Sequence, residues 1–283
     1  MKKLMYVSLC LFASAFVFGA ECSKYGRAYA STAEQGVPYL LENKSAQYVI
    51  SYRYKFPTPT RAPEVTLGMV RPLPSTGFSR GSFTSIVING IDSRVLEPKK
   101  FEIFKTKDSA GVDVHFNFNG IPMIQRFSIS DSSPLLTMTW LRGKGKVLGT
   151  IKTMSIRFTV NPSTAGRKKD YSRQVVSSRK VYTSNGKWMK QKLSAKDGNL
   201  ILQDARYQSG KGKPYAGPVL LCPDWKSILS GMVMFGNQQD MYVKFTLNPK
   251  AESWSFGMLE TEIKHSNAEF ADFVKTKLES SRQ

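Results

Sequence analysis

Residues 111–130 have the sequence GVDVHFNFNGIPMIQRFSIS, and this stretch decides the fold class. Apolar and polar residues alternate along it on both sides of Asn119 and Gly120. A period of two predicts strands, and an Asn-Gly pair tolerates the positive φ angles that a two-residue hairpin turn requires. We therefore expect an antiparallel hairpin in which Phe118 faces Ile121, so that the numbers of facing residues sum to 239.

The two faces of this hairpin differ in character. One face is mainly apolar and is expected to lie in the core, because strand side chains alternate between the two sides of a sheet. Its members are Val112, Val114, Phe116, Phe118, Ile121, Met123, Gln125 and Phe127. The other face carries Asp113 opposite Arg126, an expected surface ion pair, and His115 opposite Ile124. On this register His115 is either an ordinary strand histidine or, on a concave sheet, part of a polar row that meets sugar hydroxyls.

The same alternation recurs along most of the chain, at residues 48–54, 136–140, 154–158, 200–203, 218–221, 232–235, 241–247 and 254–263. Further turn pairs occur at 89–90, 185–186 and 197–198. The sequence therefore predicts an all-β fold, a large antiparallel β-sandwich. The proline-rich residues 58–74 predict a long connection or an edge strand, because proline donates no hydrogen bond to a neighbouring strand.

Residues near the C-terminus depart from this pattern. Ser266 and Glu269 have the spacing of a helix capping box, and apolar residues then follow at helical intervals. They are Phe270, Phe273, Val274 and Leu278. We expect one C-terminal α-helix at about residues 267–280.

The N-terminal residues have the pattern of a secretory signal. Lys2 and Lys3 precede an apolar run that ends in the small residues Gly19 and Ala20. We expect residues 1–19 to be a signal peptide and residues 20–283 to form a single domain that is exported to the periplasm or the extracellular space. No later stretch approaches 18 apolar residues, so we expect no transmembrane segment in the mature chain.

The mature chain retains two cysteines, Cys22 and Cys222. An even number in an oxidising compartment is compatible with a disulfide, and two free thiols are the alternative. We expect neither a cofactor nor a metal site, because the chain has no Gly-rich phosphate loop, no H-E-x-x-H and no paired C-x-x-C.

Positive charge is concentrated in one segment. Residues 167–213 hold 13 basic and three acidic residues, a net charge of +10, within a chain whose net charge is +20. Aromatic residues lie between the cations, and lysine with exposed rings suits an anionic polysaccharide or envelope glycan better than nucleic acid in an exported protein. The candidate ligand-binding residues are Arg126, Arg179, Tyr182, Lys187, Trp188 and Lys190. The alternative is a solvated face that only keeps the protein soluble. Within the segment, we expect a hairpin that turns at 185–186 and places Trp188 on one face.

The run from Gly120 to Trp140, the alternating stretch from Val147 to Val160 and the acidic strand with Glu260 and Glu262 resemble the galactose-mutarotase-like super-sandwich. That fold serves aldose epimerases, polysaccharide lyase domains and sugar-binding domains. The resemblance implies His115 as a general acid and Glu260 or Glu262 as a general base. The epimerases' Asn-His pair and later His-rich segment are absent. Glu260 and Glu262 are equally compatible with a charged strand face in solvent.

These features favour a secreted carbohydrate-binding protein over an enzyme. The leading hypothesis is recognition of an anionic polysaccharide through basic and aromatic side chains. A sugar-active enzyme of the aldose epimerase or polysaccharide lyase type is the first alternative. The second is a structural or assembly protein of the cell envelope that recruits a protein partner through an exposed strand edge or the terminal helix.

Overall fold

The computed structural model describes residues 19–24, 29–30, 34–55, 64–70, 84–145, 147–159, 173–184, 187–204, 219–236 and 241–260. The expected signal peptide, apart from Gly19, lies outside these residues, as do the expected helix at 267–280 and Glu262. Within the described residues, no helix is long and apolar enough to cross a membrane.

The described residues form three antiparallel sheets, which confirms the all-β sandwich expected from the sequence. The nine-stranded sheet has the order β14 (Val181–Thr183), β13 (Arg173–Ser177), β16 (Leu200–Asp204), β17 (Val219–Pro223), β20 (Ser253–Glu260), β11 (Leu136–Arg142), β10 (Pro122–Ser130), β9 (Ser109–Asn117) and β8 (Lys100–Lys105). The six-stranded sheet has the order β15 (Met189–Leu193), β18 (Ile228–Phe235), β19 (Met241–Leu247), β12 (Met154–Thr159), β6 (Thr84–Ile88) and β7 (Ile91–Asp92). The five-stranded sheet runs β1 (Glu21–Lys24), β3 (Glu34–Glu42), β4 (Gln47–Lys55) and β5 (Glu64–Val70), and β2 (Tyr29–Ala30) also pairs with β3.

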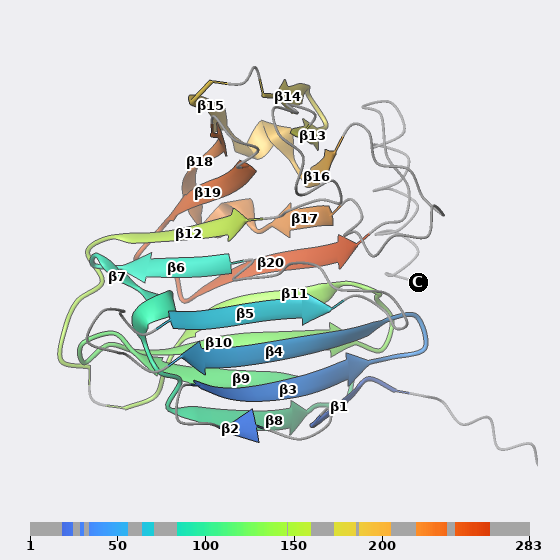
Figure 1. The fold of residues 1–283 in the computed structure, drawn as a ribbon, viewed down its shortest axis with the longest axis vertical. Coiled ribbons are helices and arrows are strands. Elements are labelled where there is room, and N and C mark those ends of the chain that lie inside the picture. Colours follow the sequence, from blue (N-terminus) through green and yellow to red (C-terminus); the bar gives the residue numbers. More distant parts are fainter. Residues whose placement is uncertain are drawn as a thin grey trace, which may run out of the picture.

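The nine-stranded sheet forms one layer, and the two smaller sheets share the layer that faces it (Figure 1). Aromatic rings join the layers in both halves. Tyr52 of the five-stranded sheet meets Phe127 of the nine-stranded sheet at 6.4 Å between ring centroids, and Phe158 of the six-stranded sheet meets Phe256 at 4.9 Å. One continuous apolar core therefore holds all three sheets together.

The hairpin of residues 111–130 has the expected register, with Asn117 opposite Pro122 and His115 opposite Ile124. Asn119 and Gly120 have φ angles of 51° and 85°, as a two-residue turn requires. The apolar face is buried, and its polar member Gln125 accepts a hydrogen bond from the Tyr52 hydroxyl across the two layers. This bond satisfies an amide that would be costly to bury alone.

Two other turn pairs do not form the hairpins that the sequence suggested. Residues 185–186 lie outside the described residues, but β14 belongs to the nine-stranded sheet and β15 to the six-stranded sheet. The chain therefore crosses from one layer to the other between these two strands, which do not pair with each other. Asp197 ends the short 3-10 helix η2 (Ala195–Asp197), and Gly198 follows it with a φ angle of 62°. The crossing is favoured because Tyr182 and Leu193 each bury an apolar side in the core from a different sheet.

The proline-rich region includes β5, which lies at the edge of the five-stranded sheet, as expected. The two cysteines lie in different sheets, Cys22 on β1 and Cys222 on β17. Both are free, so the suggested disulfide between Cys22 and Cys222 is not formed. Burial raises the pKa of each thiol to about 12.

Candidate functional site

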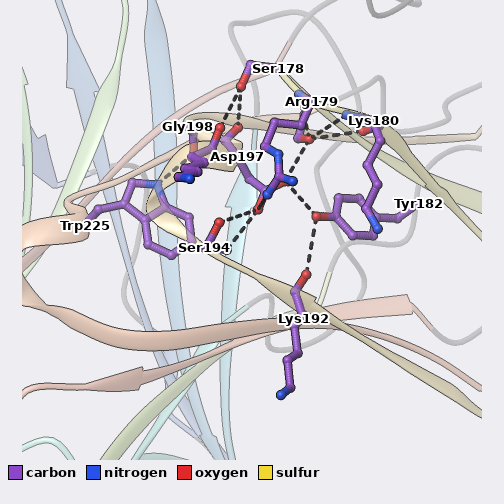
Figure 2. A network of polar contacts seen from close by, with 11 residues as sticks. Ser178, Arg179, Lys180, Tyr182, Lys192, Ser194, Asp197, Gly198 and Trp225 are labelled. Carbon is purple, nitrogen blue, oxygen red and sulfur yellow. Dashed lines mark hydrogen bonds and ion pairs between the residues drawn. The ribbon is translucent and has the colours of Figure 1, made fainter.

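A buried carboxylate, Asp197, organises the region where the positive charge is concentrated. Ser194 and Asp197 have capping-box spacing, and the Ser194 backbone N–H and hydroxyl donate to Asp197 Oδ2 at 2.9 and 3.1 Å. The other oxygen, Oδ1, accepts from the Tyr182 hydroxyl at 2.7 Å and from Ser177 Oγ at 3.1 Å. Figure 2 shows Asp197 between Ser194 and Tyr182. We name Ser177, Tyr182, Ser194 and Asp197 the Asp197 cluster.

The Asp197 cluster stabilises the ionised carboxylate. Burial alone raises the pKa of Asp197, but the hydrogen bonds from Tyr182, Ser194 and Ser177 outweigh it, and the pKa lies below its usual value. Burial, with the neighbouring carboxylate, raises the pKa of Tyr182. Arg179 supplies the nearest cation, with Nη1 4.0 Å from Asp197 Oδ2. Asp197 is therefore a fixed negative charge beneath a positive surface.

The cluster also ties the two layers together at this end of the molecule. Ser177 lies on β13 and Tyr182 on β14, both in the nine-stranded sheet, whereas Ser194 directly follows β15 of the six-stranded sheet. Trp225, in η3 (Trp225–Ser227), donates from Nε1 to the carbonyl of Gly198 at 2.8 Å (Figure 2). Within the basic segment, the backbone of Ser194 is thus held by a hydrogen bond to Asp197, and the backbone of Gly198 by one from Trp225.

Exposed cations and one exposed indole lie in the same segment of the chain as this cluster. We name them the basic edge: Arg179, Lys180, Lys187, Trp188, Lys190, Lys192 and Lys196, all exposed. Trp188 is 58% exposed, so more than half of its surface is accessible to solvent. Within the described part of the chain, Lys190, Lys192 and Lys196 have no acidic partner. Among the residues that the structure describes, their charge is therefore uncompensated.

Tyr182 does not belong to this surface. Its side chain is 1% exposed, and its hydroxyl donates to Asp197, whereas the sequence pattern placed an exposed ring here. Lys180 covers the ring, with Nζ 4.5 Å from the centroid. The role of Tyr182 is to hold Asp197 rather than to contact a ligand.

Arg126 lies elsewhere. It makes two hydrogen bonds to Asp113, of 2.7 and 2.6 Å, and its guanidinium lies 4.4 Å from the centroid of the Phe104 ring. The ion pair with Asp113 was expected from the hairpin register. Arg126 is on β10, six positions along the sheet from β14, a separation of about 29 Å at the usual strand spacing. It is not part of the basic edge.

His115 has a carboxylate partner that sequence reasoning missed. Nε2 lies 2.6 Å from Glu102 Oε2, and Glu102 also contacts Lys100 at 2.5 Å. The hydrogen bond from Lys100 lowers the pKa of Glu102. The contact with His115 has the distance of an ion pair, although Nε2 has no partner in hydrogen-bonding geometry. Strands β8 and β9 form a second antiparallel pair, in which Lys100 is opposite His115 and Glu102 is opposite Asp113. Pairing these two strands in the sequence could have placed Glu102 near His115.

The structure does not bring His115 and Glu260 together. Across the sheet, His115 is in line with Ile124, Leu141 and Ser253. Glu260 is the last residue of β20, seven positions beyond Ser253, or roughly 23 Å along the strand. The acid and base pair implied by the family resemblance is therefore not assembled from these two residues. Among the described residues, no group of three or more His, Cys, Asp or Glu side chains could hold a metal ion.

Comparison with known proteins bears on the fold. No protein-family model matches the chain, and no curated protein is similar to it in sequence. Two structures of the α-N-acetylgalactosaminidase NagBb from Bifidobacterium bifidum, in complexes with Gal-NHAc-DNJ and with GalNAc, match at a TM-score of 0.50 and 7% and 8% identity. The chain is similar in fold to part of that enzyme. The match covers 88% of this chain and 39% of the enzyme, so the chain spans about two fifths of its length.

An α-galactosidase from Lactobacillus brevis matches at a TM-score of 0.45 and 9% identity, over 87% of this chain and 42% of its own. The NagBb likeness shows a shared β architecture. It does not single out the galactose-mutarotase-like family that the strand pattern resembled, and that closer assignment stays an expectation.

Proposed function

We propose that the chain is an exported carbohydrate-binding β-sandwich protein that recognises an anionic polysaccharide at the basic edge. The observation that carries the proposal is Trp188, 58% exposed and flanked by Lys187 and Lys190, which are exposed as well. A sugar ring has an apolar face that covers an indole, and its carboxylate or sulfate groups are neutralised by lysine. This combination of groups suits an acidic glycan better than a neutral one.

The Asp197 cluster supports this assignment because it preorganises the surface. Long lysine side chains lose rotamer entropy when they bind, and a mobile backbone would add to that cost. Here the turn before Lys180 and the segment after Lys192 are both fixed by hydrogen bonds to Ser177 and Asp197. At these two points the backbone is ordered before the ligand binds.

The structural comparison supports the sugar-related part of the proposal by analogy. NagBb is an α-N-acetylgalactosaminidase, and its structures match this chain over most of its length. A fold hosts many functions, so the likeness adds to the case made by the basic edge and does not replace it.

Polygalacturonate binding tests the proposal. Wild-type protein is expected to bind polygalacturonate and not neutral galactan, with an affinity that falls steeply between 0.01 and 1 M salt, because the screening length falls from about 30 Å to about 3 Å. Trp188→Ala is expected to weaken binding by about five- to tenfold, the scale of one stacking contact. Leu148→Ala, which trims another exposed apolar side chain, is the matched control and is expected to bind as wild type does. Equal binding of charged and neutral polymers, or wild-type affinity in Trp188→Ala, would refute it.

The two alternatives make different predictions. A sugar-active enzyme built on His115 and Glu260 finds no support in the geometry, since the two residues lie on distant parts of the nine-stranded sheet. An envelope assembly protein would be recovered with a protein partner and would show no preference among polysaccharides. Preference for polygalacturonate in purified protein therefore separates binding of glycan from assembly.

A further inference from the structure

The outer face of the six-stranded sheet carries a second set of cations in line with the basic edge. Along β12 and β19, odd and even positions separate, with Ile156, Phe158 and Val243 buried in the core and their neighbours turned outward. Directly paired residues share a face, so the register shows which outward side chains lie next to each other. We use the term outer face for the side of this sheet opposite the core.

One row of the outer face contains three cations. Lys192 on β15 pairs with Met232 on β18, Met232 with Lys244 on β19, and Lys244 with Arg157 on β12. Lys192 and Lys244 are exposed, and Met232 and Arg157 are half-buried. Three strand spacings separate Lys192 from Arg157, which is about 14 Å. The row therefore presents positive charge across the sheet, at right angles to the strands.

The adjoining row supplies an aromatic ring. Lys190 pairs with Met234, and Met234 with Tyr242, which is half-buried on β19. The Arg157 guanidinium lies 5.5 Å from the centroid of the Tyr242 ring. The outer face thus repeats the combination found at the basic edge, an aromatic ring beside cations.

One described acidic group offsets part of this charge. Among the described residues of the outer face, the acidic one is Asp92 on β7, and it is bound by Arg94 through a contact of 2.8 Å. Burial, and then the positive charge of Arg94, lower the pKa of Arg157, and they outweigh the opposite effect of Asp92. An anion placed on this row would relieve that repulsion, whereas a neutral ligand would leave it in place.

A cavity of about 250 Å³ lies on the same side, one row further along. Ser155 of β12 and Thr246 of β19 face each other in its lining, and Val87 pairs with Ser155. Lys152 and the exposed Leu229 also line the cavity. Hydroxyl groups beside apolar side chains match the mixed surface of a sugar ring.

We infer that a linear anionic polysaccharide crosses the outer face from Lys190 and Lys192 to Arg157, with one of its sugars in the cavity beside Ser155 and Thr246. This inference rests on the proposed function and extends it: the ligand is a chain of several acidic sugars rather than one terminal sugar, and it lies across the strands. Charge complementarity selects the occupant, because the row offers cations without free carboxylates and spans more than one sugar.

Variants in the row test this inference against a matched control. Lys244→Gln removes one exposed charge from the row, and Lys107→Gln removes one exposed charge from the loop between β8 and β9. We expect Lys244→Gln to weaken binding of a hexagalacturonate about three- to fivefold, the upper range for an exposed charge contact, and to flatten its salt dependence. Lys107→Gln is expected to match wild type. Tyr242→Ala is expected to weaken binding of the hexagalacturonate to a similar degree.

Ligand length gives the second readout. A digalacturonate cannot reach from Lys192 to Arg157, so wild type is expected to bind it more weakly than the hexamer, and Lys244→Gln is expected to lose a smaller factor of affinity for the dimer than for the hexamer. If hexagalacturonate binds wild type but Lys244→Gln and Tyr242→Ala bind it with wild-type affinity, the inference is wrong and the proposed function stands. If wild type binds no anionic polysaccharide, both fail. A folded state for each variant is confirmed by its near-UV circular dichroism.

Discussion

Asp197 is the residue on which the basic edge depends. It is 1% exposed and accepts hydrogen bonds from three other members of its cluster. Asp197→Ala would remove the acceptor that Ser177, Tyr182 and Ser194 share, and we expect the free energy of unfolding at pH 7 to fall by about 3 kcal/mol. Asp224→Ala is the control, because Asp224 accepts one hydrogen bond at the start of η3 and its loss is expected to cost about 1 kcal/mol. Urea denaturation measures both, and equal losses would contradict the central role of Asp197.

The same carboxylate makes stability depend on acid pH. The pKa of Asp197 lies below its usual value in the folded state, whereas in the unfolded state it is about 3.9. The contribution of the ionised Asp197 to the free energy of unfolding is therefore complete above pH 4. It is lost as the pH falls through the folded pKa, because the carboxyl group binds its proton at a higher pH in the unfolded chain. We expect wild type to lose more stability than Asp197→Asn between pH 5 and the acid limit. Parallel stability curves for the two proteins would show that this carboxylate is not held ionised.

At the scale of single elements, the two Asn-Gly turns provide a matched pair. Gly90 and Gly120 both have a φ angle of 85°. A Cβ at Gly90 would meet nothing within 4 Å, whereas a Cβ at Gly120 would lie 2.8 Å from Leu148 Cβ. We expect Gly90→Ala to lower the free energy of unfolding by about 1 kcal/mol, from backbone strain alone, and Gly120→Ala to lower it further. Thermal denaturation gives the comparison, and equal losses would mean that the loop around Leu148 yields without cost.

The elements also show what could be predicted from the sequence. Hairpin 111–130 was predictable because its turn chemistry, its period and its ion pair all depend on nearby residues. The placement of β14 and β15 in different sheets was not predictable, because it depends on where Tyr182 and Leu193 pack in the core. The local signal between these strands was a turn pair, and tertiary packing overrode it.

The candidate site was predictable only in part. The exposed positions of Arg179, Lys187, Trp188 and Lys190 follow from charge and strand alternation, and the structure exposes all four side chains. The Asp197 cluster depends on the capping box of Ser194 and Asp197, which the turn pair at 197–198 did not predict. The outer face could not be derived at all, because Lys244 and Arg157 meet Lys192 only through the pairing of strands far apart in the chain.

At the scale of the whole molecule, one long sheet faces two shorter ones (Figure 1). Positive charge is concentrated in residues 167–213. The five-stranded sheet packs against β9 and β10, and the six-stranded sheet packs through Phe158 and Phe245 against Phe256. On the other side of the six-stranded sheet Lys192 and Lys244 are exposed, and that side adjoins the basic edge through β15. The fold thus brings a dispersed set of cations into one continuous surface.

Methionine methyl NMR tests this account most directly. Met232 and Met234 lie among the cations of the outer face, whereas Met123 and Met138 are buried in the core. On titration with hexagalacturonate, we expect the methyl resonances of Met232 and Met234 to shift and those of Met123 and Met138 to stay in place, with the shifts abolished at 1 M salt. Saturable binding that leaves Met232 and Met234 unmoved, or shifts that persist unchanged at 1 M salt, would contradict the account.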